Sequence, residues 1–263
     1  MTYQGVVFFD YDGTLADEKL GIFLPTETTC QALEKLSARG YMTVLSTGRA
    51  KCYVPDTGVE FNGYVTTNGA YAEVDGQPVY EKYIDEDNLE QLMAAMDGMG
   101  LAYSLEHQDM CYASDMEDPD FLHMLENFGI PLSVFRPLAE MPDRRASKLL
   151  MAYREEWQYD RLSAEFTGIF NLYKHRKNKS VDINYTGITK ATGAAEIIRV
   201  FQIPRKRVYV FGDGSNDYDI MKLAGHGIAM RDHAACLDGV CEMVTGGVEE
   251  EGIAMALQKY GII

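Results

Sequence analysis

Three apolar runs predict buried strands that each end in a polar turn containing glycine. The runs open the segments 6–17, 41–49 and 207–217. Strands that are apolar throughout their length are typical of a parallel sheet covered by helices on both faces. We therefore expect these three strands to belong to such a sheet, with their polar turns along one edge.

Helical patterns alternate with these strands. Residues 26–40 are predicted to form a helix that Thr26 caps and Gly40 ends, with leucines at helical spacing between them. Residues 64–83 predict short strands with a hairpin turn at Asp75-Gly76. A helix, two short strands and a closing helix follow at 189–203, 226–230, 241–245 and 250–261. The alternation predicts an α/β fold with a doubly wound, Rossmann-like parallel sheet.

The pattern changes between residues 83 and 184. Helices are predicted there at 85–100, 118–129 and 155–168, and strands at 146–153 and within 169–184. This mixture is typical of a separate α+β unit with its own strand meander. We therefore predict a core formed by residues 1–82 and 185–263, with an α+β domain inserted at 83–184.

The composition is that of a globular protein with an excess of acidic residues. The chain has 263 residues, of which 46% are hydrophobic and 24% charged, and its formal net charge is −16. Such a charge repels nucleic acid and anionic membranes, so neither is an expected partner. It also repels anionic ligands, so an anion-binding site needs binding groups placed directly around the anion. The alternative is that the acidity serves only to keep the protein soluble.

The cysteines and the absence of long apolar segments predict a cytoplasmic protein. The five cysteines are scattered and form no CxxC pair: Cys30, Cys52, Cys111, Cys236 and Cys241. This favours a reducing compartment over a disulfide scaffold or a zinc module. We find no signal peptide and no run of 18 apolar residues. The oligomeric state stays open between monomer and homodimer.

Acidic residues follow two of the predicted strands. Asp10 and Asp12 come after the first strand, and Asp213 and Asp217 after the third. Ligands of such sheets bind beyond the carboxyl ends of the strands, where these side chains can converge. Converging carboxylates need a cation, and hard oxygen ligands without nearby histidine or cysteine favour Mg²⁺. A single Asp-Gly turn is ordinary turn chemistry, but two such turns after buried strands favour a site.

The same turns carry groups that bind phosphate. Gly13-Thr14, Thr47-Gly48 and Gly214-Ser215-Asn216 offer backbone N–H groups and hydroxyls. Lys190 could add a positive charge. Phosphoryl transfer requires a nucleophile, a metal, and cations or N–H groups that bind the phosphoryl oxygens. A carboxylate can be the nucleophile.

These segments resemble the motifs of a known family. "DYDGTLAD" is similar to the first motif of haloacid dehalogenase (HAD) superfamily phosphatases of the Cof-like group, "LSTGR" to the second, "GITKATG" to the third and "GDGSNDYDIM" to the fourth. All four occur in the family's order, between Asp10 and Met221. One departure is "MRDHA", which stands where the group usually has a small Met-Gly-Asn-Ala run.

The resemblance implies roles for the residues that match. Asp10 is the implied nucleophile and a Mg²⁺ ligand, and Asp12 the implied general acid and base, with its backbone carbonyl on the metal. Thr47 and the N–H of Gly48 are expected to hold the phosphoryl group. Lys190 is expected to neutralise Asp10 and the phosphate.

For several other residues, more than one role stays open. Asp213 is expected to complete the metal ligands. Asn216 is expected to contact the phosphoryl group, and Asp217 to support either the metal or the lysine. Arg49 could contact substrate or form a structural salt bridge. Asn68 could line the site or serve a turn.

The position of the insertion carries a further implication. It lies between the second and third motifs, which resembles the larger, type IIB cap of this superfamily. The resemblance thus implies a Mg²⁺-dependent phosphatase that hydrolyses small phosphomonoesters, such as a sugar phosphate, a nucleotide or a phosphorylated cofactor, through an aspartyl phosphate. Two alternatives are a phosphomutase or phosphotransferase, against which the cap position weighs, and a non-catalytic regulator that binds a phosphorylated ligand.

Overall fold

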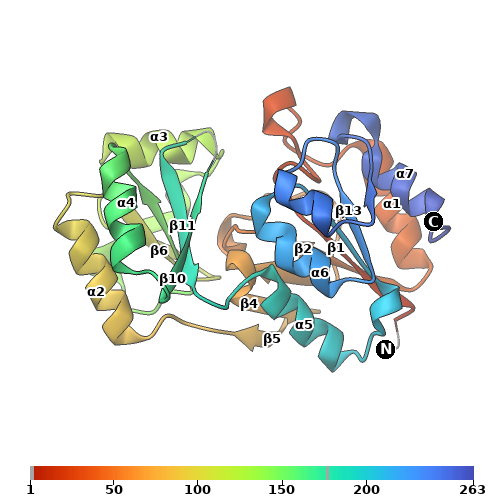
Figure 1. The fold of residues 1–263 in the computed structure, drawn as a ribbon, viewed down its shortest axis with the longest axis horizontal. Helices are drawn as coiled ribbons and strands as arrows, with labels where there is room; N and C mark the ends of the chain where they lie inside the picture. The colour runs from red at the N-terminus through yellow and green to blue at the C-terminus, as the bar shows by residue number, and fades with distance from the viewer. Residues whose placement is uncertain (1–2, 176–177) are drawn as a thin grey trace. The chain divides into compact units, whose positions relative to one another are not determined.

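The computed structural model describes residues 3–175 and 178–263 (Figure 1). The chain divides into two compact units. The first comprises Met1–Thr47, Pro55–Tyr80 and Thr189–Ile263, and the second comprises Gly48–Val54 and Glu81–Ile188. The short segment 48–54 therefore belongs to the second unit, although the residues on both sides of it belong to the first.

The first unit is built on an eight-stranded sheet with the order β14-β13-β12-β1-β2-β3-β4-β5. The strands are β1 (Gly5–Phe9), β2 (Tyr41–Ser46), β3 (Gly63–Thr66), β4 (Tyr71–Val74), β5 (Gln77–Glu81), β12 (Val208–Gly212), β13 (His226–Ala229) and β14 (Met243–Val244). Pairing is parallel from β14 through β3, and β4 is antiparallel to β3. The predicted α/β class is confirmed. The predicted hairpin turn also forms, with positive φ at Asp75 and Gly76.

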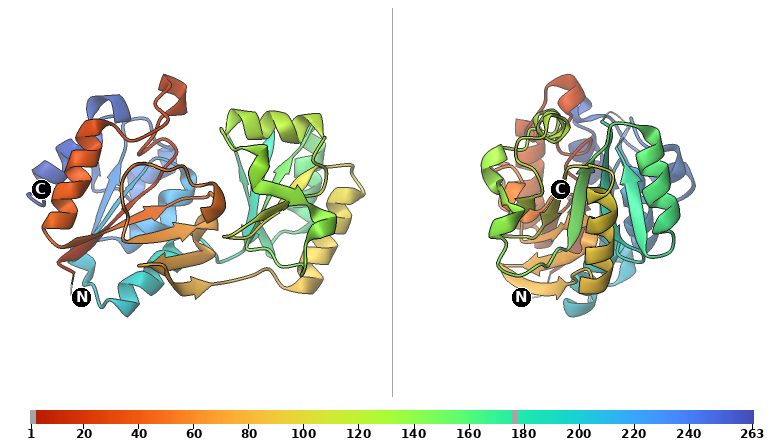
Figure 2. Two further views of the ribbon diagram at one scale, coloured as in Figure 1. Left: turned by 180° about the vertical axis from the view of Figure 1, so that it is seen from behind. Right: turned by 90° about the vertical axis from the view of Figure 1, so that its left-hand side faces the viewer.

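Helices cover this sheet. They are α1 (Glu27–Ala38), α5 (Lys190–Val200), α6 (Tyr218–Leu223) and α7 (Gly252–Lys259). Val6 and Phe8 of β1 belong to the apolar core that Ile197 of α5 and Ile220 of α6 complete. Because strand side chains alternate between faces, Val7 and Phe9 point to the opposite face, where they are also buried. Helices α1 and α7 pack together in the first unit (Figure 2).

The order of the strands places three polar turns at one edge of the sheet. β1 lies between β12 and β2 and is parallel to both, with Phe9 opposite Phe211 and Leu45. The residues that follow these strands therefore leave the sheet at the same edge. This position, where the chain crosses to opposite sides of β1, is the usual ligand-binding position of doubly wound sheets.

The second unit has a six-stranded sheet with the order β10-β11-β9-β6-β7-β8. Its elements are α2 (Glu86–Asp97), β6 (Tyr103–Glu106), β7 (Cys111–Ala113), α3 (Pro119–Asn127), β8 (Phe135–Pro137), β9 (Lys148–Ala152), α4 (Glu156–Glu165), β10 (Phe170–Lys174) and β11 (Ser180–Tyr185). Two apolar cores form, one with α2 and α4 and one with α3. The predicted α+β composition of this region is found, including its three helices.

A buried group of charges connects segment 48–54 to this sheet. Lys148 Nζ lies 2.6 Å from Asp182 Oδ1 and 3.0 Å from Glu106 Oε2. The Tyr53 hydroxyl donates a hydrogen bond of 2.7 Å to Glu106. Burial alone would lower the pKa of Lys148, but the charges of Asp182 and Glu106 outweigh it and raise this pKa. Tyr53 and Ala50 also belong to the α3-side core, so both polar and apolar contacts hold the segment.

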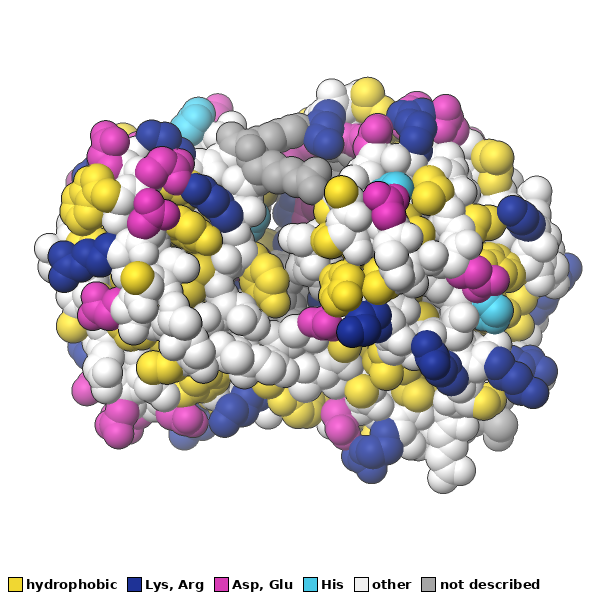
Figure 3. All heavy atoms as spheres, viewed as in Figure 1, with side chains coloured by type: hydrophobic (Ala, Val, Ile, Leu, Met, Phe, Trp, Pro, Cys, Tyr) yellow, Lys and Arg dark blue, Asp and Glu magenta, His cyan; other side chains and the backbone are white. Residues whose placement is uncertain are grey.

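The surface is mixed in charge. On the face drawn in Figure 3, acidic and basic side chains are interspersed and neither sign forms a continuous patch. Each helix in the described part of the chain is too short or too polar to cross a membrane.

We predict that Lys148→Met destabilises the second unit by about 3–5 kcal/mol, because it removes the cation that pairs with the buried carboxylates of Glu106 and Asp182. The only tryptophan, Trp157, lies in α4, so its fluorescence during urea unfolding reports on this unit. Lys174→Met is the matched control, because Lys174 pairs with Glu156 at the surface and its loss should change little. Equal stability of the two variants would contradict a structural role for the buried group.

Candidate active site

Asp10 is the first residue after β1 and is held at the sheet edge by its backbone. Its N–H donates to the Phe211 carbonyl at 3.0 Å, which extends the pairing with β12 by one residue. Its side chain is buried, and Oδ1 accepts a 2.7 Å hydrogen bond from the N–H of Tyr11. The strand pairing therefore fixes this carboxylate in a defined position.

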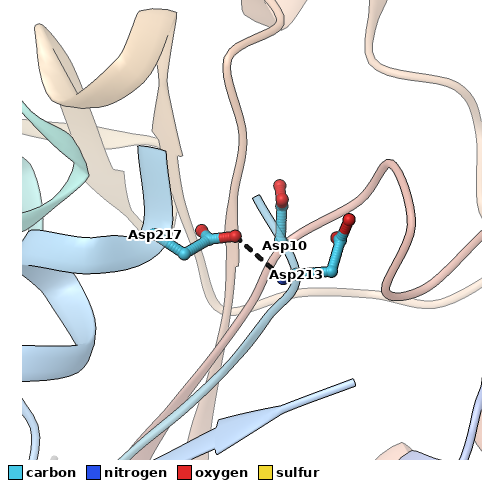
Figure 4. Close-up of side chains that lie close together, drawn as sticks. All are labelled: Asp10, Asp213 and Asp217. Atoms are coloured by element: carbon cyan, nitrogen blue, oxygen red, sulfur yellow. Dashed lines mark hydrogen bonds between the residues drawn. The ribbon is translucent and has the colours of Figure 1, made fainter. Parts of the chain in front are cut away.

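Three aspartates gather at this edge. Asp10, Asp213 and Asp217 each offer a carboxylate oxygen within 4.8 Å of the others (Figure 4). Asp213 follows β12, and Asp217 ends the 3-10 turn Ser215–Asp217. Residues separated by more than 200 positions thus come close enough to share one cation.

Lys190 is the cation of this group. Its Nζ lies 2.7 Å from Asp10 Oδ1 and 2.7 Å from Asp217 Oδ1, and the side chain has no exposed surface. It is the first residue of α5, whose start is fixed by reciprocal hydrogen bonds between Thr189 and Thr192. Burial alone would lower the pKa of Lys190, but the charges of Asp10 and Asp217 outweigh it and raise the pKa. The amine is therefore an ammonium ion.

Asp217 holds Lys190 and the neighbouring turn together. Its Oδ1 accepts from Lys190, while Oδ2 accepts from the backbone N–H groups of Asp213 at 3.0 Å and Gly214 at 2.9 Å. Both oxygens are therefore engaged by protein donors. Of the two supporting roles left open for Asp217, the geometry favours the one that positions Lys190.

Two glycines make room for the carboxylates. Gly13 has φ +89°, and a methyl group on it would lie 2.3 Å from Asp213 Oδ2. A methyl group on Gly212 would lie 2.5 Å from Asp217 Cγ. Sequence reasoning assigned Gly13 to phosphate binding and did not predict these close approaches. The only indication in the sequence is that each of these glycines adjoins an aspartate, in the segments "DGT" and "GDG".

The charges in this group do not balance. When all are ionised, three carboxylates and one ammonium leave two negative charges close together. Burial first, and then the charge of Asp217, raise the pKa of Asp213 to about 7. Burial, followed by the same neighbour, raises the pKa of Asp10 well above its ordinary value. A divalent cation would remove this repulsion, and a set of carboxylate oxygens suits Mg²⁺.

The other residues of the first two motifs have distinct positions. Asp12 is exposed, and its side chain is not part of the three-aspartate group. The hydroxyl of Thr14, predicted to face phosphate, donates to Asp213 Oδ1 at 3.0 Å. Thr47 is buried at the end of β2, where its N–H donates to Val65 and its carbonyl accepts from Asn68.

Gly48 and Arg49 belong to the second unit. The Arg49 guanidinium is buried and donates to the Phe128 carbonyl at 3.2 Å. This contact gives Arg49 a structural role within that unit. The other role considered for Arg49, a contact with substrate, stays a prediction.

Asn68 connects two of the turns. Its Oδ1 accepts a 3.0 Å hydrogen bond from Asn216 Nδ2, so the turn after β3 is fixed to the turn after β12. Asn68 also has φ 54°, a left-handed conformation that asparagine tolerates better than most residues. It follows Thr67, whose φ of 50° is unusual for a β-branched residue. The contact of Asn68 with Asn216 was not predicted.

Comparisons with known proteins identify the family of the chain. The model of the haloacid dehalogenase-like hydrolase family matches residues 7–257. The chain is 26% identical to the Bacillus subtilis protein YkrA, provisionally named a phosphatase, over 98% of both chains. It is 23% identical to the 5-amino-6-(5-phospho-D-ribitylamino)uracil phosphatase YitU of B. subtilis, over 97% of both. It spans 54% of a Streptococcus pyogenes protein provisionally named a bifunctional phosphatase and peptidyl-prolyl cis-trans isomerase, with 27% identity over 98% of this chain.

Solved structures share the fold. A hypothetical protein of Geobacillus kaustophilus superposes with a TM-score of 0.83 at 26% identity, over 98% of this chain and 99% of that one. BT4131, described as a HAD subclass IIB sugar phosphatase, superposes with a TM-score of 0.85 at 23% identity, over 99% and 100%. The fold and the family implied by the four motifs are both confirmed. The chain belongs to the haloacid dehalogenase-like hydrolase family.

Proposed function

We propose that this protein is a Mg²⁺-dependent phosphatase that hydrolyses small phosphomonoesters through an aspartyl phosphate on Asp10. The observation that carries the proposal is the buried contact of Asp10 with Lys190 beside Asp213. The names of the relatives support the substrate class. YitU and the Escherichia coli protein YbjI, which is 23% identical, are both named for a phosphorylated ribitylaminouracil, and BT4131 is described as a sugar phosphatase.

Asp10 is suited to attack phosphorus. Lys190 and the N–H of Tyr11 both bind its Oδ1, which favours Oδ2 as the attacking oxygen. The ammonium of Lys190 also favours the charged, nucleophilic form of the carboxylate. When bound by Asp10, Asp213 and the backbone carbonyl of Asp12, Mg²⁺ would neutralise the charge of the phosphoryl oxygens.

The remaining steps use groups around this carboxylate. Asp12 is proposed to donate a proton to the leaving oxygen and then to take one from the water that hydrolyses the aspartyl phosphate. Lys190, Thr47, the N–H of Gly48 and Asn216 are proposed to hold the equatorial oxygens. The second unit is proposed to be the cap that selects the leaving group. Release of one inorganic phosphate per ester cleaved would distinguish hydrolysis from transfer to another acceptor.

We predict that Asp10→Asn lowers turnover of p-nitrophenyl phosphate on the order of 10³-fold or more, because an amide cannot act as the nucleophile. The measurement is the rate of nitrophenol release, with circular dichroism to verify folding. Asp87→Asn makes the same change at an exposed position on α2 and should keep full activity. Normal turnover by Asp10→Asn would refute the proposed nucleophile.

We predict that Mg²⁺ raises the temperature of thermal unfolding, because the folded protein alone assembles the carboxylates. The shift should be much smaller in Asp213→Asn and unchanged in Asp87→Asn. Chelation by EDTA should abolish turnover, and added Mg²⁺ should restore it. An equal thermal shift in Asp213→Asn would show that the ion binds elsewhere.

We predict that Gly13→Ala lowers turnover at least ~100-fold. The new methyl group would push the carboxylate of Asp213, a proposed metal ligand, farther than the small displacement that a catalytic site tolerates. Gly21→Ala is the matched control. Gly21 also has positive φ, at +72°, but a methyl group there meets no atom within 4 Å. Both variants should lose about 1–2 kcal/mol of stability from backbone strain. A comparable loss of turnover in both would contradict the steric explanation.

A further inference from the structure

Two cysteines that are distant in the sequence face each other in the second unit. The Sγ atoms of Cys52 and Cys111 are 3.5 Å apart, across a sequence separation of 59 residues. Cys52 lies in segment 48–54, and Cys111 is the first residue of β7. The scattered positions of the five cysteines gave no indication of this pair.

The surroundings hold the two sulfurs in place. Cys111 is completely buried in the core on the α3 side, which also contains Ala50 and Tyr53 on either side of Cys52. The hydrogen bond from Tyr53 to Glu106 anchors the segment from the polar side. Cys52 is half-buried and Cys111 is buried, so Cys52 is the more accessible residue of the pair.

We propose that Cys52 and Cys111 form a modification site, a dithiol that a disulfide oxidant such as oxidised glutathione converts to an internal disulfide. The Cys52 thiolate attacks glutathione disulfide and releases one reduced glutathione. The Cys111 sulfur then attacks Cys52 Sγ in the mixed disulfide, forms the Cys52–Cys111 bond and releases the second glutathione. The two cysteines lose two electrons and two protons in total, and the oxidant takes them up.

The order of the two attacks follows from the burial of the sulfurs. Burial first, and then the hydrogen bond with Cys52, raise the pKa of the Cys111 thiol well above its ordinary value. Thiolates are the reacting species in disulfide exchange, so the more accessible Cys52 is the sulfur that reacts with the oxidant. The sulfurs must then approach by about 1.5 Å to reach an S–S bond of roughly 2.05 Å.

The bond would join two parts of the second unit covalently. It would close the chain between segment 48–54 and β7, where ordinary packing and hydrogen bonds now hold it. Closing a long loop restricts the unfolded chain, so the oxidised protein should unfold at a higher temperature. This inference does not depend on the proposed phosphatase activity.

The test uses the full chain with Cys236→Ser, which removes an exposed thiol. The protein is treated with oxidised glutathione, alkylated, digested and analysed by mass spectrometry, with a parallel sample unfolded in urea. We expect a single internal disulfide between Cys52 and Cys111, formed at least tenfold faster in the folded than in the unfolded sample. With Cys111→Ser added, the reaction should stop at a glutathione adduct on Cys52.

Three results would overturn the proposal. The first is a lasting glutathione adduct on Cys52 while Cys111 stays free. The second is no reaction of either sulfur in the folded protein. The third is a mixture of pairings involving Cys30 or Cys241 that does not depend on folding.

Discussion

The proposed function depends on the buried contacts of Lys190 with Asp10 and Asp217. Without the ammonium, three carboxylates with oxygens within 4.8 Å of one another would lack the cation that pairs with two of them. With it, two negative charges remain when all three carboxylates are ionised, and one divalent cation would balance them. The lysine reaches this position because α5 begins at residue 190. The helix start therefore matters as much to the site as the strands that carry the aspartates.

The site could be predicted from the sequence where it depends on strand order. Asp10 and Asp213 each follow an apolar run, and parallel strands end at a common edge, so their proximity followed from the pattern alone. Lys190 was expected there because the motifs resemble those of a known family. By contrast, the hydrogen bond between Asn68 and Asn216 depends on how two turns approach each other. No periodicity or motif encodes such a contact.

The fold was also predictable only in part. The main helices and strands follow from apolar spacing and from caps such as Thr26, whose hydroxyl accepts from Thr29 N–H as expected. The six-residue helix α6 is too short to show a period, and β8 has only three residues, of which Arg136 and Pro137 are exposed. Segment 48–54 belongs to the second unit through Tyr53 and Ala50, and these contacts connect residues that are distant in the sequence. The pair of Cys52 and Cys111 stayed hidden for the same reason.

The account is tested most directly by identifying the residue that carries the phosphoryl group during turnover. The enzyme is mixed with excess p-nitrophenyl phosphate and Mg²⁺, quenched in acid within one turnover, and reduced with borohydride, which converts an aspartyl phosphate to homoserine. Peptide mass spectrometry then locates the modified position. The account predicts homoserine at position 10 in the complete enzyme and none in Asp10→Asn. Phosphate release without modification of Asp10, or modification of another residue, would contradict it.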